Sequence, residues 1–478
     1  MSIEKSAVSA LKWTAGLRLA GQLASWLSTL FVLRLLTPQD YGLMAVVATL
    51  TGIGIAIADF GLSNSMIQAR TLARDMQAKL AGMIVALHLV MMLIVMATAP
   101  VAAWFFRDDR LLSLLLVASL QYAFAAAAAV PHALAIRAMN FSWLARVELL
   151  TVVLGSLSTL AMAIHGAGVW ALVGGMLVTA ATRTLLLVTS GENIRPSFHF
   201  AGMHSHLSYS TNMAASQVVW NVASQSDVMI GGRVLGSTAL GAYSVGLHLA
   251  TLPMQKIMSV INQVAFAAVA RLQDETERLR LRLTQATRTL ALSAVGPMWG
   301  LAAVAPELVR LIIGGKWQEA ILPLQLISVV VPLRMLSMVL ATAVAGVGAA
   351  HVNLRNTLTT AIVWPLCFVV GAQWGANGLA ASWLFAAPLT FVLNARRTGN
   401  ALGLHMGNLL RTVWSPVAAG LVMFMVIVAL RAVSADWNDL SRLISMVCTG
   451  ALAYVLAVRL LDNQLLQEVR RLITTARG

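Results

Sequence analysis

The sequence has few cysteines and few charged residues. Only Cys367 and Cys448 are present among 478 residues, and both lie inside apolar stretches without a Cys-x-x-Cys partner. A disulfide framework and a cysteine-based metal site are therefore excluded. Charged residues make up 11% of the chain, against about 25% in soluble domains. This shortage excludes a protein built mainly of soluble domains.

The sequence also lacks the motifs of common enzymes. It has no phosphate-binding glycine loop and no His-Glu-x-x-His motif, and no connecting segment is long enough to fold alone. His204 and His206 have a metal-like spacing, but without acidic residues or cysteines nearby we interpret them as part of a loop. We expect no catalytic residue, no metal site and no cofactor.

Long apolar stretches dominate what is present. Hydrophobic residues make up 59% of the chain, and the mean hydropathy is +0.80. The stretches long enough to cross about 30 Å of hydrocarbon predict about fourteen transmembrane helices. We therefore expect an all-α polytopic membrane protein.

The 33 Lys and Arg residues outnumber the 18 Asp and Glu residues and give a net charge of +15. They are spaced singly between apolar stretches and are not clustered in one domain, so membrane topology explains them better than nucleic-acid binding. Most fall on one side of the predicted membrane, whereas Arg431 and Arg442 fall on the other. The positive-inside rule places both termini in the cytoplasm.

The stretch around Pro38 recurs in the second half of the chain. At one constant offset, Arg34 aligns with Arg233, Leu36 with Leu235, Gly42 with Gly241 and Val46 with Val245. At a slightly longer offset, Arg146 aligns with Arg355 and Gly166 with Gly375. A parallel duplication predicts two pseudo-symmetric six-helix lobes, residues 1–195 and 205–400, with a transmembrane pair and a basic cytoplasmic tail in 401–478.

Ionisable residues inside predicted spans are the main candidates for function, because burying charge in a bilayer is costly. Arg18 and Asp59 lie at similar depth on either side of the Pro38 turn. They form either a buried ion pair that holds the first two helices together, or a functional pair. In the second case Arg18 faces a hydrated cavity and Asp59 tunes it or takes a coupling proton.

Lys256 and Arg334 lie in the middle of later spans, each shortly after a proline. If Arg18, Lys256 and Arg334 all face inward, the cavity between the lobes is cationic. Such a cavity suits an anionic ligand, and arginine is well shaped for bidentate contacts with phosphate. We predict these three residues to bind substrate.

A polar face precedes these spans. Gln217, Trp220 and Asn221 combine amide groups with an aromatic ring, as in a sugar-binding wall, and Asp227 is a second candidate for coupling or gating. The same side chains could instead form hydrogen bonds between helices. Residues 270–288 mix Glu and Arg on a predicted amphipathic helix that we expect to lie on anionic headgroups.

Two strings carry a family resemblance. LRLLTPQDYGLMAVV, followed by ADFGLSNSMIQAR, closely resembles the opening signature of the WzxC-like branch of Wzx-type polysaccharide flippases. LAAVAPELVRLIIGGKWQEAILPLQLIS resembles the matching signature of the second half. These flippases belong to the multidrug/oligosaccharidyl-lipid/polysaccharide exporter superfamily, and the resemblance covers about residues 10 to 400.

The resemblance implies a transporter of the bacterial inner membrane that is not an enzyme. It would move an undecaprenyl-diphosphate-linked oligosaccharide across the bilayer by alternating access, for exopolysaccharide or O-antigen assembly, with H+ or Na+ as the coupling ion. Its partners would be the polymerase and chain-length regulator of the same pathway. The alternative is a cation-coupled drug antiporter, whose organic cations would favour carboxylates in the cavity. A polymerase or ligase should have one large periplasmic loop, and none is present.

Overall fold

The structure, a computed structural model, is mainly helical in its described part. It describes residues 21, 25–59, 62–68, 73–190, 194–199, 217–271 and 276–462. These residues contain no strand. Within them, ten helical segments are long and apolar enough to cross a membrane. The predicted all-α, multi-pass architecture is confirmed, while the number of about fourteen spans stays a prediction.

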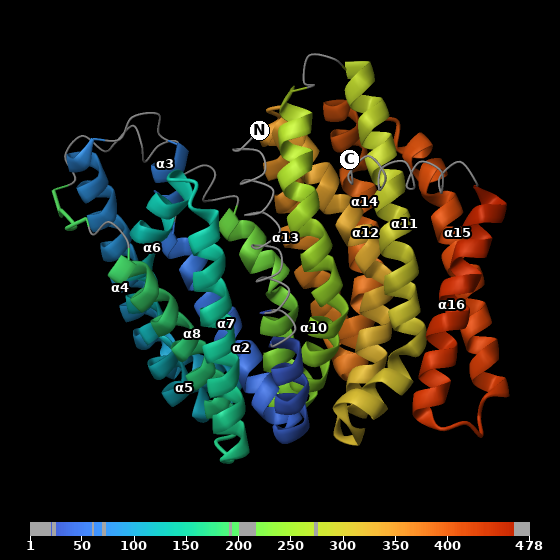
Figure 1. The fold of residues 1–478 in the computed structure, drawn as a ribbon, viewed down its shortest axis with the longest axis horizontal. Coiled ribbons are helices and arrows are strands. Elements are labelled where there is room, and N and C mark those ends of the chain that lie inside the picture. Colours follow the sequence, from blue (N-terminus) through green and yellow to red (C-terminus); the bar gives the residue numbers. More distant parts are fainter. Residues whose placement is uncertain are drawn as a thin grey trace, which may run out of the picture. The chain divides into compact units, whose positions relative to one another are not determined.

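By its contacts the chain divides into two compact units, Met1–Gly241 and Ala242–Gly478. The segments 1–195, 205–400 and 401–478 stay a prediction. In the first unit the helices are Ser25–Leu35, α2 (Pro38–Asp59), α3 (Leu62–Gln68), α4 (Arg74–Phe106), α5 (Arg110–Ala118), α6 (Leu120–Arg137), α7 (Phe141–Ile164), α8 (Val169–Ser190) and the beginning of α10 (Ser226–Arg271) (Figure 1).

The second unit holds the rest of α10 and the helices that follow it. These are α11 (Thr276–Leu308), η1 (Val309–Ile313), η2 (Gly315–Ala320), α12 (Ile321–Gly346), α13 (Ala350–Gly371), η3 (Ala372–Trp374), α14 (Gly375–Leu402), α15 (Met406–Val433) and α16 (Asp439–Leu461). Helices α12 and α13 each pack against α14, and α11 packs against α12, α15 and α16.

The first turn of α2 is capped by its own sequence. Pro38 occupies the first helical position, where a missing N–H costs nothing. The Asp40 carboxylate accepts hydrogen bonds from the Thr37 N–H at 2.9 Å and the Thr37 hydroxyl at 2.7 Å, and the Asp40 N–H donates to the Thr37 hydroxyl at 3.3 Å. This reciprocal pairing satisfies N–H groups that the helix leaves open and explains why the chain turns here.

Glycines with positive φ lie at three turns of the predicted repeat, at Gly166, Gly236 and Gly375. Helix α10 is broken at Gly236, which has φ 76° and aligns with Thr37 in the repeat. Gly166, between α7 and α8, has φ 76°, and its repeat partner Gly375, the first residue of α14, has φ 74°. Such angles strain a residue with a side chain, so glycine is needed at both places. A turn is present at both Gly166 and Gly375, and the duplication itself stays a prediction.

Within the first unit, Gly42 of α2 lies against the part of α10 that carries its repeat partner, Gly241. A Cβ atom added at Gly42 would overlap the carbonyl oxygen of Ser237, and one added at Gly241 would overlap that of Pro38. The two backbones therefore cross in direct contact. The contact is reciprocal, because each glycine lies against the backbone segment that contains the other.

Helix α11 is joined to α15 and α16 by a charged cluster at one end. The carboxylate of Glu307, which is 1% exposed, accepts two hydrogen bonds from Arg431, at 2.9 and 2.8 Å. Arg442 Nε lies 3.9 Å from the same carboxylate, and its Nη2 donates to the Arg431 carbonyl at 2.9 Å. One buried acid thus holds arginines from both terminal helices.

A second cluster joins the same helices at their other end. Arg288 of α11 forms an ion pair with Asp462, and Ser415 of α15 donates a hydrogen bond to Asp462 at 3.0 Å. Between Arg288 and Glu307 helix α11 rises about 28 Å at 1.5 Å per residue. That distance is close to the thickness of the hydrocarbon layer, about 30 Å. The two clusters therefore lie one membrane thickness apart.

Candidate functional site

The candidate with the most defined surroundings is Arg334 in α12. Its guanidinium carbon lies 4.1 Å from the ring centre of Trp383 in α14 and 5.6 Å from that of Trp364 in α13. The two indole rings meet edge to face, with centres 4.8 Å apart. A cation over an indole face is attracted by the negative potential of the ring, most strongly where water is excluded. We call these three residues the Arg334 cluster.

Hydrogen bonds fix both rings of the Arg334 cluster. The Trp383 Nε1 donates to the hydroxyl of Tyr243 at 2.9 Å, and the Trp364 Nε1 donates to the hydroxyl of Thr390 at 3.3 Å. Phe368 packs against Trp383 with ring centres 4.9 Å apart. Both tryptophans are buried. The rings therefore form a rigid support that sets the position of the Arg334 side chain.

Arg334 itself is half-buried. Its contacts with the rings use the positive charge of the guanidinium. The planar fork of an arginine can bind two oxygens of one phosphate, and a rigid support lowers the entropy cost of doing so. The chemistry of arginine is compatible with an anionic ligand, and substrate binding by Arg334 stays a prediction.

Asp59 ends α2, where its carboxylate accepts a 2.5 Å hydrogen bond from Ser63. It also interacts electrostatically with His88 in α4 and His132 in α6. The Nδ1 of His88 donates to the Ile84 carbonyl at 2.8 Å, so Nε2 is the nitrogen left to take up a proton. The sequence indicated Asp59 but missed its proximity to two histidines, which come from separate helices.

The polar face before α10 is partly occupied by local hydrogen bonds. Gln217 is exposed, Trp220 and Asn221 are half-buried, and the Asn221 amide donates to the Gln217 carbonyl at 2.8 Å. Asp227 is fully buried, and its carboxylate accepts a 2.8 Å bond from the Val228 N–H. These residues belong to the first unit and Arg334 to the second, and the predicted sugar-binding wall stays a prediction.

Two predicted site residues cannot be placed in full. Arg18 lies outside the described residues, and Lys256 belongs to α10 but its side chain lies outside the described part. Whether Arg18 pairs with Asp59, and whether Arg18, Lys256 and Arg334 share a cavity, stay predictions. In the described part of the chain, no group of three or more His, Cys, Asp or Glu residues could hold a metal ion.

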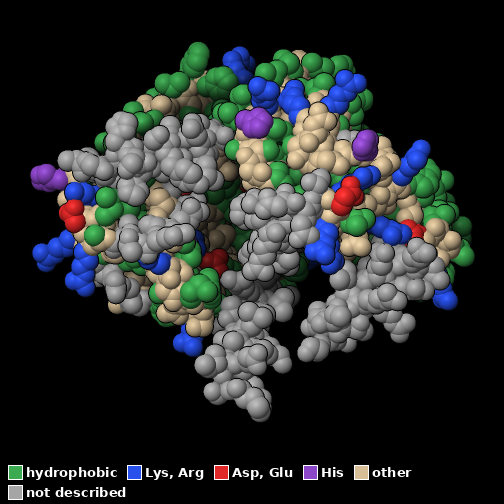
Figure 2. All heavy atoms as spheres, turned by 90° about the horizontal axis from the view of Figure 1, so that it is seen from above, with side chains coloured by type: hydrophobic (Ala, Val, Ile, Leu, Met, Phe, Trp, Pro, Cys, Tyr) green, Lys and Arg blue, Asp and Glu red, His purple; other side chains and the backbone are tan. Residues whose placement is uncertain are grey.

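Basic side chains are common on the face seen in Figure 2. Lys and Arg are spread over its visible surface, and Asp and Glu are few. The surroundings of Arg334 include Trp364, Trp383 and Tyr243, which could not be selected from the sequence. They lie on three different helices, and tryptophan in an apolar stretch is ordinary packing material. Only the tertiary structure reveals that they surround Arg334.

The chain is similar to bacterial proteins of polysaccharide assembly. It is 24% identical to the Escherichia coli (strain K12) lipopolysaccharide biosynthesis protein WzxC, over 82% of this chain and 81% of that protein. It is 26% identical to the Rhizobium meliloti (strain 1021) succinoglycan biosynthesis transport protein ExoT, over 93% of this chain and 90% of that protein.

Its fold is that of a solved flippase. The structure of the lipid II flippase MurJ in an inward closed conformation matches with a TM-score of 0.75 and 11% identity, covering 94% of this chain and 99% of that one. At this identity the match shows the fold alone. The family model described as polysaccharide biosynthesis protein matches residues 31–322. The chain therefore belongs to the family of polysaccharide biosynthesis proteins.

Proposed function

We propose that the protein is a flippase that moves an undecaprenyl-diphosphate-linked oligosaccharide across the bacterial inner membrane by alternating access. The observation that carries the proposal is membership of the polysaccharide biosynthesis family across residues 31–322. Transport by such a protein makes and breaks no covalent bond, in agreement with a sequence without catalytic motifs. Both termini lie in the cytoplasm in this proposal.

The chemistry of the Arg334 cluster supports this substrate class. A lipid-linked diphosphate carries negative charge, which a half-buried guanidinium can bind through paired N–H groups. A drug antiporter would need to bind organic cations, which an arginine repels. Asp59 is our candidate for a coupling proton, because an acidic side chain inside a membrane span is costly and marks a functional position. It also interacts electrostatically with His88 and His132.

Export in a deletion strain tests the proposal. We expect deletion to stop polymer export and to leave lipid-linked repeat units on the cytoplasmic leaflet, and wild-type protein to restore export. Arg334→Ala should lower export at least about tenfold, since a charge-assisted hydrogen bond contributes about 1.5–3 kcal/mol. Arg334→Lys should retain part of the activity, because it keeps the charge and loses the planar fork.

Arg396→Ala is the matched control. Arg396 is an exposed arginine of α14, so its loss changes the net charge equally without touching the Arg334 cluster. Membrane levels of every variant are measured by immunoblot. If deletion left polymer export unchanged and increased drug sensitivity, the antiporter function would take the place of the flippase proposal. Normal export by Arg334→Ala would remove Arg334 from the substrate path and leave the flippase proposal standing.

A further inference from the structure

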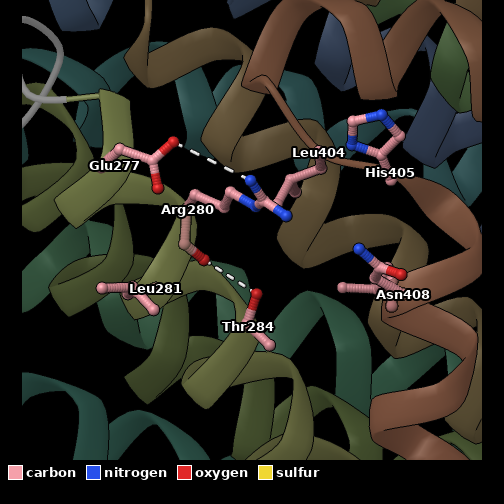
Figure 3. Close-up of a pocket in the computed structure, with 8 residues that line it drawn as sticks. Glu277, Arg280, Leu281, Thr284, Leu404, His405 and Asn408 are labelled. Carbon is pink, nitrogen blue, oxygen red and sulfur yellow. Dashed lines mark hydrogen bonds and ion pairs between the residues drawn. The ribbon is translucent and has the colours of Figure 1, made fainter.

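A pocket of about 350 Å³ lies in the second unit, between the start of α11 and the junction of α14 with α15. Figure 3 shows its walls coming from these two segments, which face each other across an open space. The lining residues are Glu277, Arg280, Leu281, Thr284, Leu404, His405, Asn408 and Leu409. None of them belongs to the Arg334 cluster.

The floor of the pocket is apolar and fixed. Leu404 and Leu409 are buried and belong to a core cluster that also contains Leu279, Leu283 and residues of α12. Because protein cores are densely packed, this floor has little freedom to close the pocket. At the edge, Leu281 is 62% exposed. The pocket therefore combines an immobile base with an apolar side chain that reaches outward.

Several polar side chains of the pocket can donate hydrogen bonds, among them Arg280, His405 and Asn408. In Figure 3, Arg280 extends from α11 toward His405, and Asn408 lies on the same wall as His405. The one acid, Glu277, lies at the rim with its side chain 80% exposed and 3.8 Å from Arg280. At this distance and exposure the ion pair is weak. The Arg280 fork is thus able to bind a second anion.

The pocket lies where two membrane spans end. The apolar segment that includes α11 runs from Glu277 to Ile313, which makes it longer than the hydrocarbon layer requires. Its first turns carry Arg278, Arg280, Arg282 and Arg288. In α15, Trp414 is 65% exposed about two turns beyond Asn408, and exposed tryptophan favours the membrane interface. The pocket therefore opens at the level of lipid headgroups.

We propose that this pocket binds the phosphate of an anionic phospholipid of the surrounding membrane. Arg280, His405 and Asn408 surround the phosphate, and Leu281 contacts the glycerol and ester region of the same lipid. Basic pockets between spans are suited to anionic headgroups, because the lipid supplies both the charge and the apolar surface. The site is separate from the Arg334 cluster and does not depend on the proposed transport function.

Binding is measured on the full-length protein in an uncharged detergent. Dihexanoyl phosphatidylglycerol is titrated and bound lipid is followed by native mass spectrometry, with dihexanoyl phosphatidylcholine as the zwitterionic comparison. We expect phosphatidylglycerol to bind at least about tenfold more tightly. Arg280→Ala should weaken its binding by about tenfold or more, as expected for loss of a charge-assisted contact.

Arg282→Ala is the matched control, because Arg282 lies on the same helix, is exposed and does not line the pocket. It should change binding by less than about twofold. Equal losses in the two variants would show diffuse attraction to a basic surface and overturn the proposal. Arg280→Gln, which keeps the length of the side chain, serves as a second variant, and thermal melting verifies that each variant is folded.

A soluble phosphate distinguishes the source of the ligand. Glycerol 3-phosphate offers the phosphate without acyl chains, and we expect it to bind at least about tenfold more weakly than phosphatidylglycerol. Leu281→Asn should weaken the binding of phosphatidylglycerol and leave the binding of glycerol 3-phosphate unchanged. Equal affinity for the two ligands would overturn a lipid site in favour of a soluble phosphate. No outcome of this experiment depends on export, so it is decided separately from the flippase proposal.

Discussion

At the scale of single residues, Asp108 shows how a charge can be fixed at a membrane boundary. It lies in the short turn between α4 and α5, outside the spans. Its carboxylate accepts hydrogen bonds from Arg110 Nε at 3.0 Å and Nη2 at 2.8 Å. This paired hydrogen bond from Arg110 lowers the pKa of Asp108 below its ordinary value, against a smaller opposing effect of burial.

A lowered pKa links the stability of this turn to pH. The folded protein binds the Asp108 proton less readily than the unfolded chain, so the pair stabilises the fold above the ordinary carboxyl pKa of about 3.9. The stabilisation is lost as the pH falls from there through the lower folded pKa. Since Arg110 is about half exposed, the effect is at most about 1 kcal/mol.

We therefore predict that Asp108→Asn lowers the melting temperature of the purified protein slightly at pH 7. The difference from wild type should shrink below about pH 4, where the wild-type carboxylate becomes protonated. Asp109→Asn removes the same charge from the neighbouring exposed residue and is the matched control. A constant difference between wild type and Asp108→Asn from pH 7 to pH 3.5 would contradict this account.

At the scale of helices, the two charged clusters on α11 determine how α15 and α16 attach to the second unit. Apolar contacts alone give helices little preference for one another over lipid, because lipid chains are equally apolar. The cluster around Glu307 and the pair Arg288–Asp462 supply directional contacts at both ends of α11. The terminal pair is therefore bound as part of this unit.

We predict that Glu307→Gln destabilises the protein by about 3–5 kcal/mol. Removing the buried charge leaves Arg431 and Arg442 without their carboxylate in a site of low polarity. The measurement is thermal melting in detergent, together with proteolysis near His405, which should become faster if α15 separates from α11. Glu319→Gln changes an exposed carboxylate and is the control.

Replacing both partners separates charge loss from packing loss. Glu307→Leu combined with Arg431→Leu should be less destabilising than Glu307→Gln alone, because no uncompensated charge remains on this pair. If Glu307→Gln melted like wild type, the cluster would not hold the terminal helices.

The sequence predicted the helices and turns better than the contacts between helices. The turn at Pro38 follows from local capping by Thr37 and Asp40, and the turns at Gly166 and Gly375 follow from the repeat. The sequence placed Arg431 and Arg442 at a membrane boundary, but not against Glu307, which is far away in the chain. Spans that are apolar on every face carry no periodic signal of which side packs against protein.

The same reason limits prediction of the candidate site. Depth in a span was sufficient to select Arg334 and Asp59 as unusual residues. The partners of Arg334, Trp364 and Trp383, come from two other helices. No spacing within one helix could have revealed them.

At the scale of the whole molecule, the backbone contact between Gly42 and the segment that carries Gly241 limits which substitutions the chain tolerates. The atoms that a Cβ would meet are backbone carbonyl oxygens, which cannot move without shifting a helix. Gly52, in the same helix, has nothing within 4 Å of an added Cβ. An alanine at Gly42 and an alanine at Gly52 therefore add the same methyl group at a crowded and at an open position of one helix.

We predict that Gly42→Ala reduces stability by about 1–3 kcal/mol or more, as for other overpacked sites. Gly52→Ala should be neutral or slightly stabilising, since alanine favours the helix. Adding Gly241→Ala to Gly42→Ala should cost less than the sum of the single changes, because the first substitution already separates the backbones. Thermal melting compares the wild type with the three single variants, Gly42→Ala, Gly52→Ala and Gly241→Ala, and with the double variant. Equal melting temperatures for Gly42→Ala and Gly52→Ala would rule out the close contact.

Gly42 and Gly241 occupy equivalent places in the repeat, and each lies against the chain that carries the other. In the predicted duplication, they derive from one ancestral residue. A residue that packs against its own copy is the mark of a two-fold axis. If the duplication holds, the half-length ancestor assembled as a symmetric homodimer, and gene fusion preserved the meeting point of its two subunits.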